Sequence, residues 1–455
     1  MPNTGERSGY IALSRIAGSE KVRGFLASCV VRSPAERGGA SKAEELLRID
    51  QTGCDSLPRF VIAIDGSWTQ VPVENGFPGA EVGFVSVALV LLDLERIRHL
   101  SAEQFPAPPE VNRTVRTGAG ELVLPGCNVQ RSDARDPKHS FRHQLFEELA
   151  SIRSADDGES LLDTYHALLS YKSSARDERC PYDDCPKDTQ SFDRGLGAYT
   201  CSCSLQRPLY STDALRIHES FNLTGPSGQA YGEAMQVIER LLLINFLRTL
   251  EQKGWLDSLA QIALVVDGPL AVFGHPAWLK DAISKELQRL NQAAKRITGR
   301  DILLLGIEKS GAFLEHFIRL DTSTTGSPGT FPPGTVLLLT DAYIKDHIVL
   351  TKSERPYGYQ TYFGRKFFYK TRSGARIVGM TPYLEEGDSD LSVAFPDQFP
   401  RLPEAVALLD ALVSSRHPDL VVPLVEAHAQ ATIARGLGTR VLEQLVKELV
   451  RRGPR

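Results

Sequence analysis

The stretch Phe60-Val61-Ile62-Ala63-Ile64-Asp65-Gly66-Ser67 decides the fold of this chain. Its first five residues are apolar and rich in β-branched side chains, which is typical of a strand buried on both faces of a sheet. Aspartate, glycine and serine follow, and this combination predicts a turn. We therefore expect a buried strand that delivers Asp65 to the point where the backbone turns.

A second stretch, Leu264-Val265-Val266-Asp267-Gly268-Pro269, repeats this design. The ends of neighbouring strands in a mixed sheet are where catalytic groups converge at a mouth open to solvent. Two carboxylates that meet there repel each other unless a divalent cation lies between them, and hard oxygen ligands favour Mg²⁺ or Mn²⁺. Two such ions about 4 Å apart would hold the attacking and leaving oxygens of a phosphodiester. The alternative is that each Asp-Gly is an ordinary turn.

The remaining apolar patterns predict an α/β protein. Strand signals lie at 82–92, 262–266, 302–307, 336–340 and 357–371, and helical periodicity at 233–250, 278–297 and 403–451. Strand, helix and strand between 262 and 307 predict a right-handed βαβ unit. Four regions follow: an N-terminal helical region at 1–59, the first part of a core at 60–100, an insertion at 101–232 where the strand pattern vanishes, and the rest of the core with C-terminal helices at 233–455.

Glu239 lies inside the apolar helix expected at 233–250. A glutamate that faces a core costs several kcal/mol unless it is paired or binds a metal. It is therefore a third candidate metal ligand, and the alternative is a salt bridge with Arg240 or a solvent-facing position. Glu233 competes with it, between one and two turns earlier.

These pieces together resemble the NurA family of nucleases, which work beside HerA-type hexameric DNA translocases. The resemblance rests on an ordered set: Ile-Asp-Gly-Ser at 64–67, the Glu239 helix, Val-Asp-Gly-Pro-Leu at 266–270, Gly-Ile-Glu-Lys-Ser at 306–310 and Pro-Leu-Val-Glu-Ala-His at 423–428. It covers about 60–93 and 233–310 and resumes near the C-terminus. The long insertion departs from a minimal member of the family.

The resemblance implies an RNase H-like mixed sheet flanked by helices, in a dimeric, Mn²⁺-dependent nuclease that resects DNA ends in repair or in defence against phage. By position, Asp65, Glu239 and Asp267 would be the metal carboxylates. Lys309 would fall at the family's lysine after the last core strand, where it can neutralise a phosphate. His428 would fall at the histidine of the closing helix, where it can ligate metal or transfer a proton.

The insertion contains Cys180-x4-Cys185 and Cys201-x-Cys203 in a turn-rich stretch. Four thiolates can hold a structural Zn²⁺, and a metal would help such a piece fold. The alternative is reduced surface thiols, since these spacings are less typical than a paired x2 knuckle.

Two lesser patterns have functional and structural alternatives. Arg365, Lys366 and Lys370 alternate with aromatic residues such as Tyr362, which suits single-stranded DNA, or else an amphipathic hairpin that packs its aromatics inward. His139, His143 and Glu147 share one helix face, for which a solvated face is the better interpretation.

Bulk properties exclude some classes of protein. The 455 residues carry a net charge of −4, so any DNA contact needs a local basic surface. The polar N-terminus carries no signal-peptide pattern, and the longest apolar run, at 82–92, is too short to cross a membrane, so we expect a cytoplasmic protein. No Gly-x4-Gly-Lys-Ser/Thr loop is present, so an ATP-driven motor would have to be a partner.

Two functions from other classes remain as alternatives. The first is a catalytically silent DNA-binding or scaffold subunit of such a complex, although a scaffold has no reason to keep acids at strand ends. The second is an actin-like phosphotransferase, because that superfamily also begins with a strand followed by Asp-Gly-Ser-x-Thr, here Asp65 to Thr69. It needs a second glycine-rich phosphate loop, for which residues 271–274 are a poor substitute.

Overall fold

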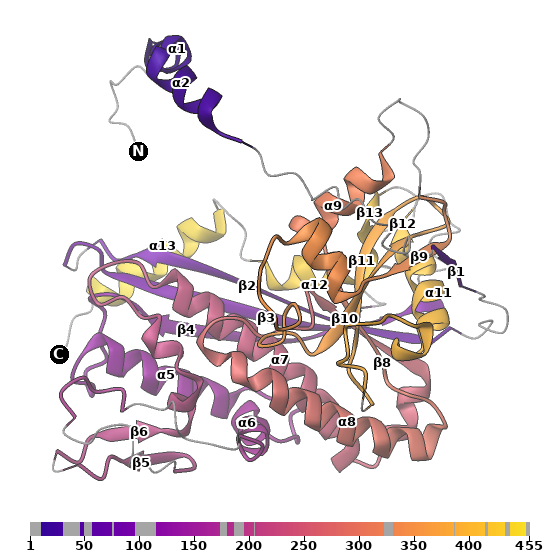
Figure 1. The fold of residues 1–455 in the computed structure, drawn as a ribbon. Helices are drawn as coiled ribbons and strands as arrows, with labels where there is room; N and C mark the ends of the chain where they lie inside the picture. The colour runs from indigo at the N-terminus through magenta and orange to yellow at the C-terminus, as the bar shows by residue number, and fades with distance from the viewer. Residues whose placement is uncertain are drawn as a thin grey trace.

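A mixed sheet runs through the molecule, with helices on both faces (Figure 1). The structure is a computed structural model that describes residues 11–30, 46–49, 57–74, 77–95, 115–172, 180–185, 195–203, 205–322, 331–385, 387–414, 417–432 and 437–451. Nine strands follow the order β1-β9-β10-β11-β8-β7-β2-β3-β4. The described part of the chain has no helix that is long and apolar enough to cross a membrane.

The centre of this sheet has the RNase H-like arrangement that the sequence predicts. Its strands are β2 (Phe60–Pro72), β3 (Glu81–Asp93), β4 (Val115–Pro125), β7 (Ile262–Asp267) and β8 (Leu303–Glu308). β2, β3 and β4 pair antiparallel, and β7 and β8 continue the sheet parallel to β2. Helix α7 (Gly228–Gln252) precedes β7, and α8 (Leu279–Thr298) links β7 to β8, as expected for a βαβ unit.

Two expectations about this region are wrong. Asp65 to Ser67 form no turn, because β2 stays paired with β3 from Phe60 to Pro72, whereas its parallel pairing with β7 stops at Ile64. The core also does not stop at residue 100, because β4 belongs to the sheet. Glycines and charged residues interrupt the alternation of β4, and its pairing along β3 holds it in the sheet instead.

The remaining elements complete both layers. One face carries α5 (Pro137–Ser151), α6 (Leu161–Leu169), η2 (Ser211–Leu215), η3 (Ile217–Glu219), η4 (Leu256–Gln261) and η5 (His275–Trp278), with the hairpin of β5 (Ala198–Thr200) and β6 (Pro208–Tyr210). The nine-stranded sheet continues beyond β8 with β11 (Arg376–Pro382), β10 (Gly364–Lys370), β9 (Thr335–Leu338) and β1 (Leu47–Arg48). This part of the chain also contains α9 (Ala312–Asp321), α10 (Asp341–Tyr343) and η6 (Ile344–Ile348). The chain ends with η7 (Pro396–Gln398), α11 (Leu402–Leu412), β12 (Val413–Ser414), β13 (His417–Val421), α12 (Val422–Ala431) and α13 (Leu437–Arg451).

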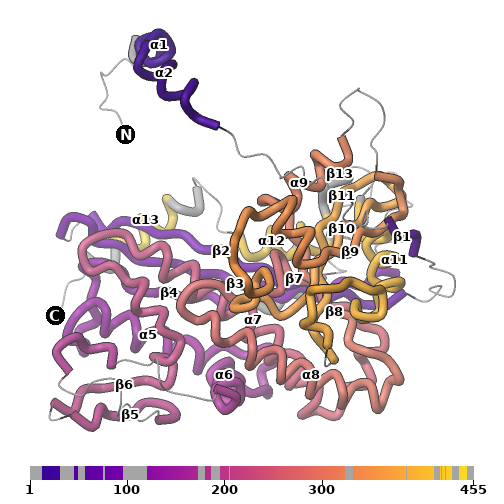
Figure 2. Tube along the Cα trace, viewed as in Figure 1, coloured from indigo at the N-terminus to yellow at the C-terminus, as the bar shows by residue number. Residues whose placement is uncertain are grey.

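Strand β2 separates two cores, because successive side chains of a strand point to opposite faces. Ile62 and Ile64 pack in the core that contains α7 and α8. Val61 and Ala63 pack in the core that contains α11 and α12. Figure 2 shows α12 beside β2, although most of the chain separates them.

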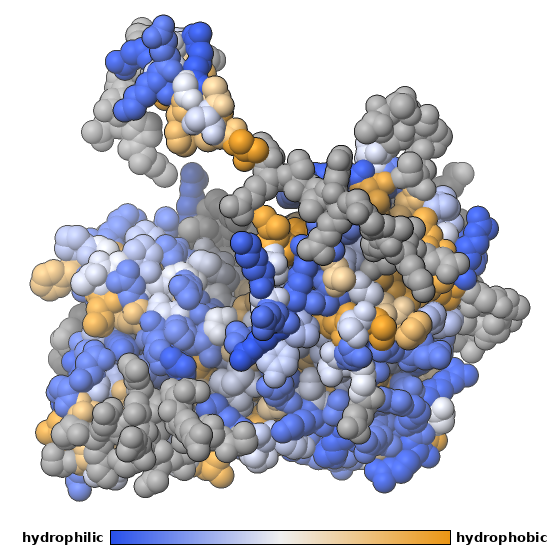
Figure 3. Space-filling view, in the orientation of Figure 1, coloured by the Kyte–Doolittle hydropathy of each residue, from blue (hydrophilic) through white to orange (hydrophobic). Residues whose placement is uncertain are grey.

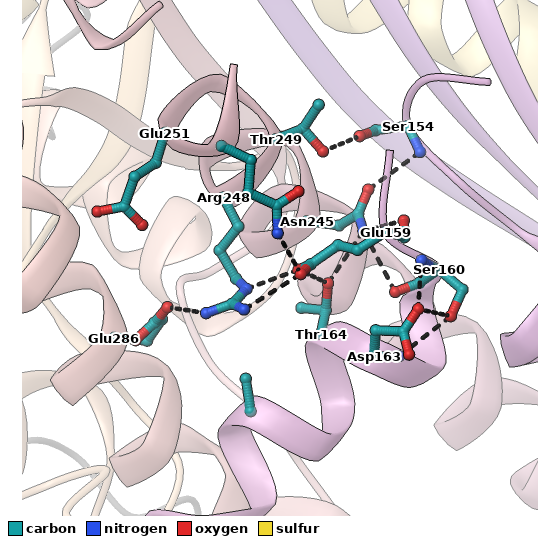
Figure 4. Close-up of polar contacts among 12 residues, drawn as sticks. Ser154, Glu159, Ser160, Asp163, Thr164, Asn245, Arg248, Thr249, Glu251 and Glu286 are labelled. Atoms are coloured by element: carbon teal, nitrogen blue, oxygen red, sulfur yellow. Dashed lines mark hydrogen bonds and ion pairs between the residues drawn. The ribbon is translucent and has the colours of Figure 1, made fainter. Parts of the chain in front are cut away.

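A network of polar side chains fastens α6 to α7 and α8 (Figure 4). The Arg248 guanidinium donates to Glu159 at 2.6 Å and to Glu286 at 2.6 Å. Asn245 donates to the Glu159 carbonyl at 2.9 Å and to the Thr164 hydroxyl at 2.9 Å. Because these partners come from three elements, the network holds α7, which carries Glu239, in one position.

Helices α1 (Ile11–Gly18) and α2 (Glu20–Ser28) lie apart from the sheet (Figure 1). The region expected to be helical at 1–59 also contributes β1, which pairs with β9 in the sheet. Phe25 and Leu26 of α2 are exposed, and hydrophobic residues are visible on the pair of helices α1 and α2 in Figure 3.

Candidate metal centre

Strand register brings the two aspartates together. Ile64 of β2 stands opposite Val266 of β7, so Asp65 and Asp267 come next on adjacent strands. Both have the parity of side chains in the core that contains α12, such as Ala63 and Val265, so both are directed to that face. The pairing expected from two similar motifs is thus present in the fold.

A histidine from the last part of the chain completes this cluster. Asp65, Asp267 and His428 each offer one ligand atom, and these atoms all lie within 4.8 Å of one another. His428 lies on α12, with Nδ1 at 2.9 Å from Oδ2 of Asp65. The imidazole is 58% exposed, whereas the Asp65 side chain is only 5% exposed. The site therefore opens to solvent beside His428.

Backbone amides orient both carboxylates. The Gly66 amide donates to Oδ1 of Asp65 at 2.8 Å, and the Gly268 amide donates to Oδ1 of Asp267 at 3.0 Å. Gly268 has φ +78°, a conformation that favours glycine. The other oxygen of each carboxylate makes the contacts within the site: Oδ2 of Asp65 with His428 and Oδ2 of Asp267 with Lys309.

Glu239 reaches the site from the opposite layer through the gap at Gly66. An added Cβ on Gly66 would lie 2.5 Å from Oε1 of Glu239, so the carboxylate lies directly against that backbone. The residue is 5% exposed. Burial, opposed by Arg240 and reinforced by Asp65 and Asp267, raises the pKa of Glu239 to about 8. Glu239 thus borders the acid cluster from the other layer, and it also forms the ion pair with Arg240 that was the alternative interpretation.

The crowding of acids also affects Asp65. Burial, followed by the charge of Asp267, raises the pKa of Asp65 to about 6, although Lys309 and His428 act in the opposite direction. Burial and mutual repulsion disfavour the charged forms of Asp65 and Glu239, and added positive charge would offset both effects. A divalent cation supplies that charge, so the donor set fits a bound metal ion.

Lys309 contacts one of the two aspartates. It follows β8 with the same parity as Leu305 and Ile307, and its Nζ donates to Oδ2 of Asp267 at 3.0 Å. Its side chain is 27% exposed. The ammonium therefore lies at the rim of the acid cluster, where it can meet an incoming anion.

Arg240 supports the site and was not singled out as a functional residue. It is 3% exposed, and its guanidinium donates to the carbonyls of Ala271 at 3.1 Å and Pro269 at 3.0 Å. It also approaches Oε2 of Glu239 at 3.4 Å. Arg240 thus fixes the loop after Asp267 against the helix that carries Glu239. The sequence signal for this role was an arginine next to a glutamate within an apolar helix.

Glu233 does not join the acid cluster. Its Oε1 accepts hydrogen bonds from Ser220 at 2.9 Å and from Gln229 at 3.1 Å, and it lies against Gly274. This carboxylate beside Gly274 also makes the 271–274 loop a poor phosphate site. Of the two candidate glutamates on α7, Glu239 is the one that lies beside the acid cluster.

The basic residues of β10 do not form a DNA surface, which corrects the expectation for Arg365, Lys366 and Lys370. They are 0%, 4% and 8% exposed. Lys366 pairs with Glu308, and Lys370 donates to Asp321 at 2.8 Å. Both edges of β10 are paired, with β9 and β11, and both of its faces are covered, because Phe367 and Tyr369 pack in one core and Phe368 in another. The inward-packed hairpin is the alternative that the structure shows.

The helix face with His139, His143 and Glu147 is not the uniformly solvated face that we expected. His139 is buried, with Nε2 at 3.2 Å from the Tyr210 hydroxyl, and Nε2 of His143 lies 3.7 Å from Glu147. Among the described residues, this set does not form a metal-ligand group. Its histidines stack on the hairpin of β5 and β6 through Tyr210.

No family model matches the chain, and no curated protein matches it. Among solved structures, the crystal structure of the NurA nuclease from Sulfolobus solfataricus matches over 99% of this chain and 98% of that chain. The sequence identity is 11% and the TM-score is 0.33. At these values the functional conclusion rests on the residues of the site itself.

Proposed function

We propose that the protein is a metal-dependent nuclease that hydrolyses phosphodiester bonds of DNA. The observation that carries this proposal is the convergence of Asp65, Asp267 and His428, whose ligand atoms lie within 4.8 Å of one another beside the interior strands β2 and β7. Glu239 and Lys309 border the same site. A site with several acids, one imidazole and one ammonium suits a reaction on a phosphate group.

Asp65, Glu239, Asp267 and His428 would hold Mn²⁺ or Mg²⁺. Carboxylate oxygens are the preferred ligands of both ions, and an imidazole nitrogen favours Mn²⁺. When bound, the metal would activate water and neutralise charge on the phosphodiester. The amides of Gly66 and Gly268 orient the aspartates, so the ligands are arranged before the ion arrives.

The remaining groups have separate roles. Lys309 places a positive charge beside Asp267, where it can stabilise charge that develops on phosphate oxygens. His428 is half-exposed and paired with Asp65, so its ring can either ligate or exchange a proton with the solvent side of the site.

A groove between α8 and the segment at 356–391 replaces β10 as the candidate DNA surface. It has a volume of about 1140 Å³ and includes Tyr362, which pairs with Ala271 in the loop after Asp267. The groove lies in the layer of α8, on the opposite face of the sheet from α12. The molecular surface over α8 is largely hydrophilic (Figure 3). Its lining includes basic and aromatic side chains, a combination that binds single strands: Lys172, Lys280, Lys285, Lys295, Tyr171, Trp278, Tyr357, Tyr359, Tyr362 and Tyr383.

The finer part of the proposal rests on the ordered motifs that resemble the NurA family. By that resemblance the protein is a homodimer that processes DNA ends beside a HerA-type ATPase, in repair or in anti-phage defence. The chain has no phosphate-binding loop of the motor type, which agrees with a separate translocase.

The two alternative functions make different demands. A scaffold does not require acids such as Asp65 and Glu239, whose pKa values are raised by burial and by the charge of Asp267, and such acids lower stability without a bound cation. A phosphotransferase of the actin-like class needs a hairpin turn after Asp65, whereas β2 continues to Pro72. Both observations favour the nuclease.

The test is incubation of the full-length protein with linear DNA and Mn²⁺, followed by separation of the products by size. We expect the wild type to shorten the DNA and Asp65→Ala to leave it intact. Asp157→Ala, which removes an exposed acid from the loop before α6, outside both the acid cluster and the groove, is the matched control and should retain activity. Intact DNA with the wild type under all metal and partner conditions would contradict the proposal, as would cleavage that survives Asp65→Ala.

A further inference from the structure

A second cluster of metal-ligand type lies in the segment between α6 and η2, which the proposed nuclease reaction does not use. The Sγ atoms of Cys180, Cys185 and Cys201 all lie within 4.8 Å of one another. Cys203 lies two residues after Cys201 and packs in the same apolar cluster as these three cysteines. Two chain segments thus bring four thiols to one point.

The separation of the sulfurs fits a tetrahedral metal. With Zn–S bonds of about 2.3 Å, two thiolates on one tetrahedral ion stand about 3.8 Å apart. The Sγ atoms of Cys185 and Cys201 are 3.8 Å apart. A disulfide would require about 2.05 Å, and all four cysteines are free thiols.

Local backbone turns present the thiols. The Cys185 amide donates to the Tyr182 carbonyl at 3.1 Å, which closes a tight turn at the first pair. Cys201 and Cys203 follow β5, where the Cys201 amide donates to the Arg207 carbonyl at 2.8 Å and the Gln206 amide donates to the Cys203 carbonyl at 3.1 Å. Each pair therefore projects its thiols from a turn, as in a zinc knuckle.

The segment has little else to hold it together. Apart from the four cysteines, its apolar cluster contains Leu209, Tyr182 and Tyr199 among the described residues. The hairpin of β5 and β6 has three residues in each strand, and an isolated hairpin of this size is marginal in water. A structural metal supplies the free energy that so small a core lacks.

We propose that Cys180, Cys185, Cys201 and Cys203 bind one structural Zn²⁺. Thiolates are soft ligands that select zinc over Mn²⁺ and Mg²⁺, so this site does not compete for the ion of the acid cluster. Four protein ligands leave no open coordination position, so the ion has a structural and not a catalytic role.

The zinc would secure one corner of the fold. The Tyr182 hydroxyl donates to the Pro208 carbonyl at 3.0 Å, and the Arg142 guanidinium lies 4.8 Å from the centre of the Tyr182 ring. Arg142 in turn donates to Asp213 at 2.6 Å, in a buried ion pair that joins α5 to η2. Loss of zinc should loosen this corner and leave the acid cluster at β2 and β7 in place.

The experiment measures zinc in full-length protein grown with added zinc and then dialysed against EDTA to strip weakly held ions. We expect one zinc per chain by mass spectrometry, and its loss from Cys185→Ser and Cys201→Ser. Cys29→Ser, an exposed cysteine on α2, is the matched control and should keep the ion. Zinc-free wild type, or equal zinc in wild type and Cys201→Ser, would overturn the proposal.

A second measurement needs no variant and covers the case in which the serine variants fail to fold. The wild type is titrated with a mercurial that reacts with thiols, while a chelating dye reports released zinc. We expect one equivalent of zinc to leave as the four cluster thiols react, after the exposed Cys29 has reacted without zinc release. Four thiols that react without any zinc release, or two disulfides found by mass spectrometry in freshly purified protein, would contradict the assignment.

Discussion

The Nδ1 atom of His428 lies 2.9 Å from Oδ2 of Asp65, although 363 positions separate the two residues in the chain. The contact forms because α12 packs on the face of the sheet to which Asp65 is directed, with Leu424 and Ala427 in the same core as Val61 and Ala63. The last part of the chain thus closes a site that begins near residue 60.

Removing one acid should abolish the response to metal without unfolding the protein. Asp267→Asn takes one charge from a crowded cluster, so in EDTA its thermal midpoint should equal or exceed that of the wild type. Mn²⁺ at a hundred times its Kd should stabilise the wild type by about 2.7 kcal/mol and the variant by much less. Thermal unfolding with and without Mn²⁺ measures both. Equal stabilisation of Asp267→Asn and of the exposed control Asp157→Asn would refute the assignment.

Lys309→Met should lower the rate of cleavage by about 100-fold, because the site loses the charge that meets the phosphate. The metal ligands remain, so stabilisation by Mn²⁺ should persist. Single-turnover cleavage and thermal unfolding separate these effects. A variant that loses metal-induced stabilisation along with activity would show that Lys309 acts only by holding Asp267.

Gly66→Ala tests the gap through which Glu239 reaches the site. The added Cβ would lie 2.5 Å from Oε1 of Glu239 and 2.9 Å from Cγ of Met235, so one of them must move. We expect a loss of about 1–3 kcal/mol in the free energy of unfolding together with loss of cleavage. Gly232→Ala on α7 is the control, because its Cβ meets Trp68 at an ordinary 3.5 Å. Full activity of Gly66→Ala would separate Glu239 from the reaction.

The groove along α8 should carry DNA affinity that β10 does not. Lys285 is exposed on the groove, so Lys285→Glu should weaken binding of single-stranded DNA. The slope of log affinity against log salt concentration should become shallower by about one, because one phosphate contact is lost. Lys366→Met removes a buried charge and should leave the salt dependence unchanged. Titrations at several salt concentrations check this, with Lys21→Glu on α2 as the exposed control. An unchanged slope for Lys285→Glu would exclude the groove.

His218 should make the protein less stable in acid. Burial lowers the pKa of His218 to about 4, so the folded protein keeps the imidazole neutral, whereas the unfolded chain takes a proton below about pH 6.5. This stability is present above pH 6.5 and is lost as the pH falls towards 4, by about 2 kcal/mol between pH 7 and pH 5. Denaturant unfolding of the wild type and His218→Gln should show the smaller loss in the variant; equal losses would contradict the expected neutral histidine.

Local sequence patterns were sufficient to predict the strands and helices whose signal lies in a short run of residues. The apolar runs before Asp65 and Asp267 predict strands β2 and β7, and the helices at 233–250 and 278–297 lie within α7 and within one residue of α8. The strand β4 escaped prediction because its glycines and charges hide the alternation, and its partner β3 supplies the hydrogen bonds that hold it. The turn after Asp65 was wrong for a related reason, since pairing with β3 extends β2 to Pro72.

The basic run at 365–370 illustrates the limit of composition. Its charges resemble a DNA surface, and only the position of β10 between β9 and β11 shows that they are buried beside Glu308 and Asp321. A sequence lists the charges but not their partners, because those partners come from β8 and α9.

The residue types of the acid cluster and the order of their motifs were evident from the sequence by itself, since each depends on a strand or helix of a few residues. The tertiary structure decided which acids meet. Strand register sets Asp65 beside Asp267, the gap at Gly66 admits Glu239 but not Glu233, and packing of α12 brings His428 to Asp65. These choices depend on contacts between residues far apart in the chain, and no local pattern encodes a contact of that kind.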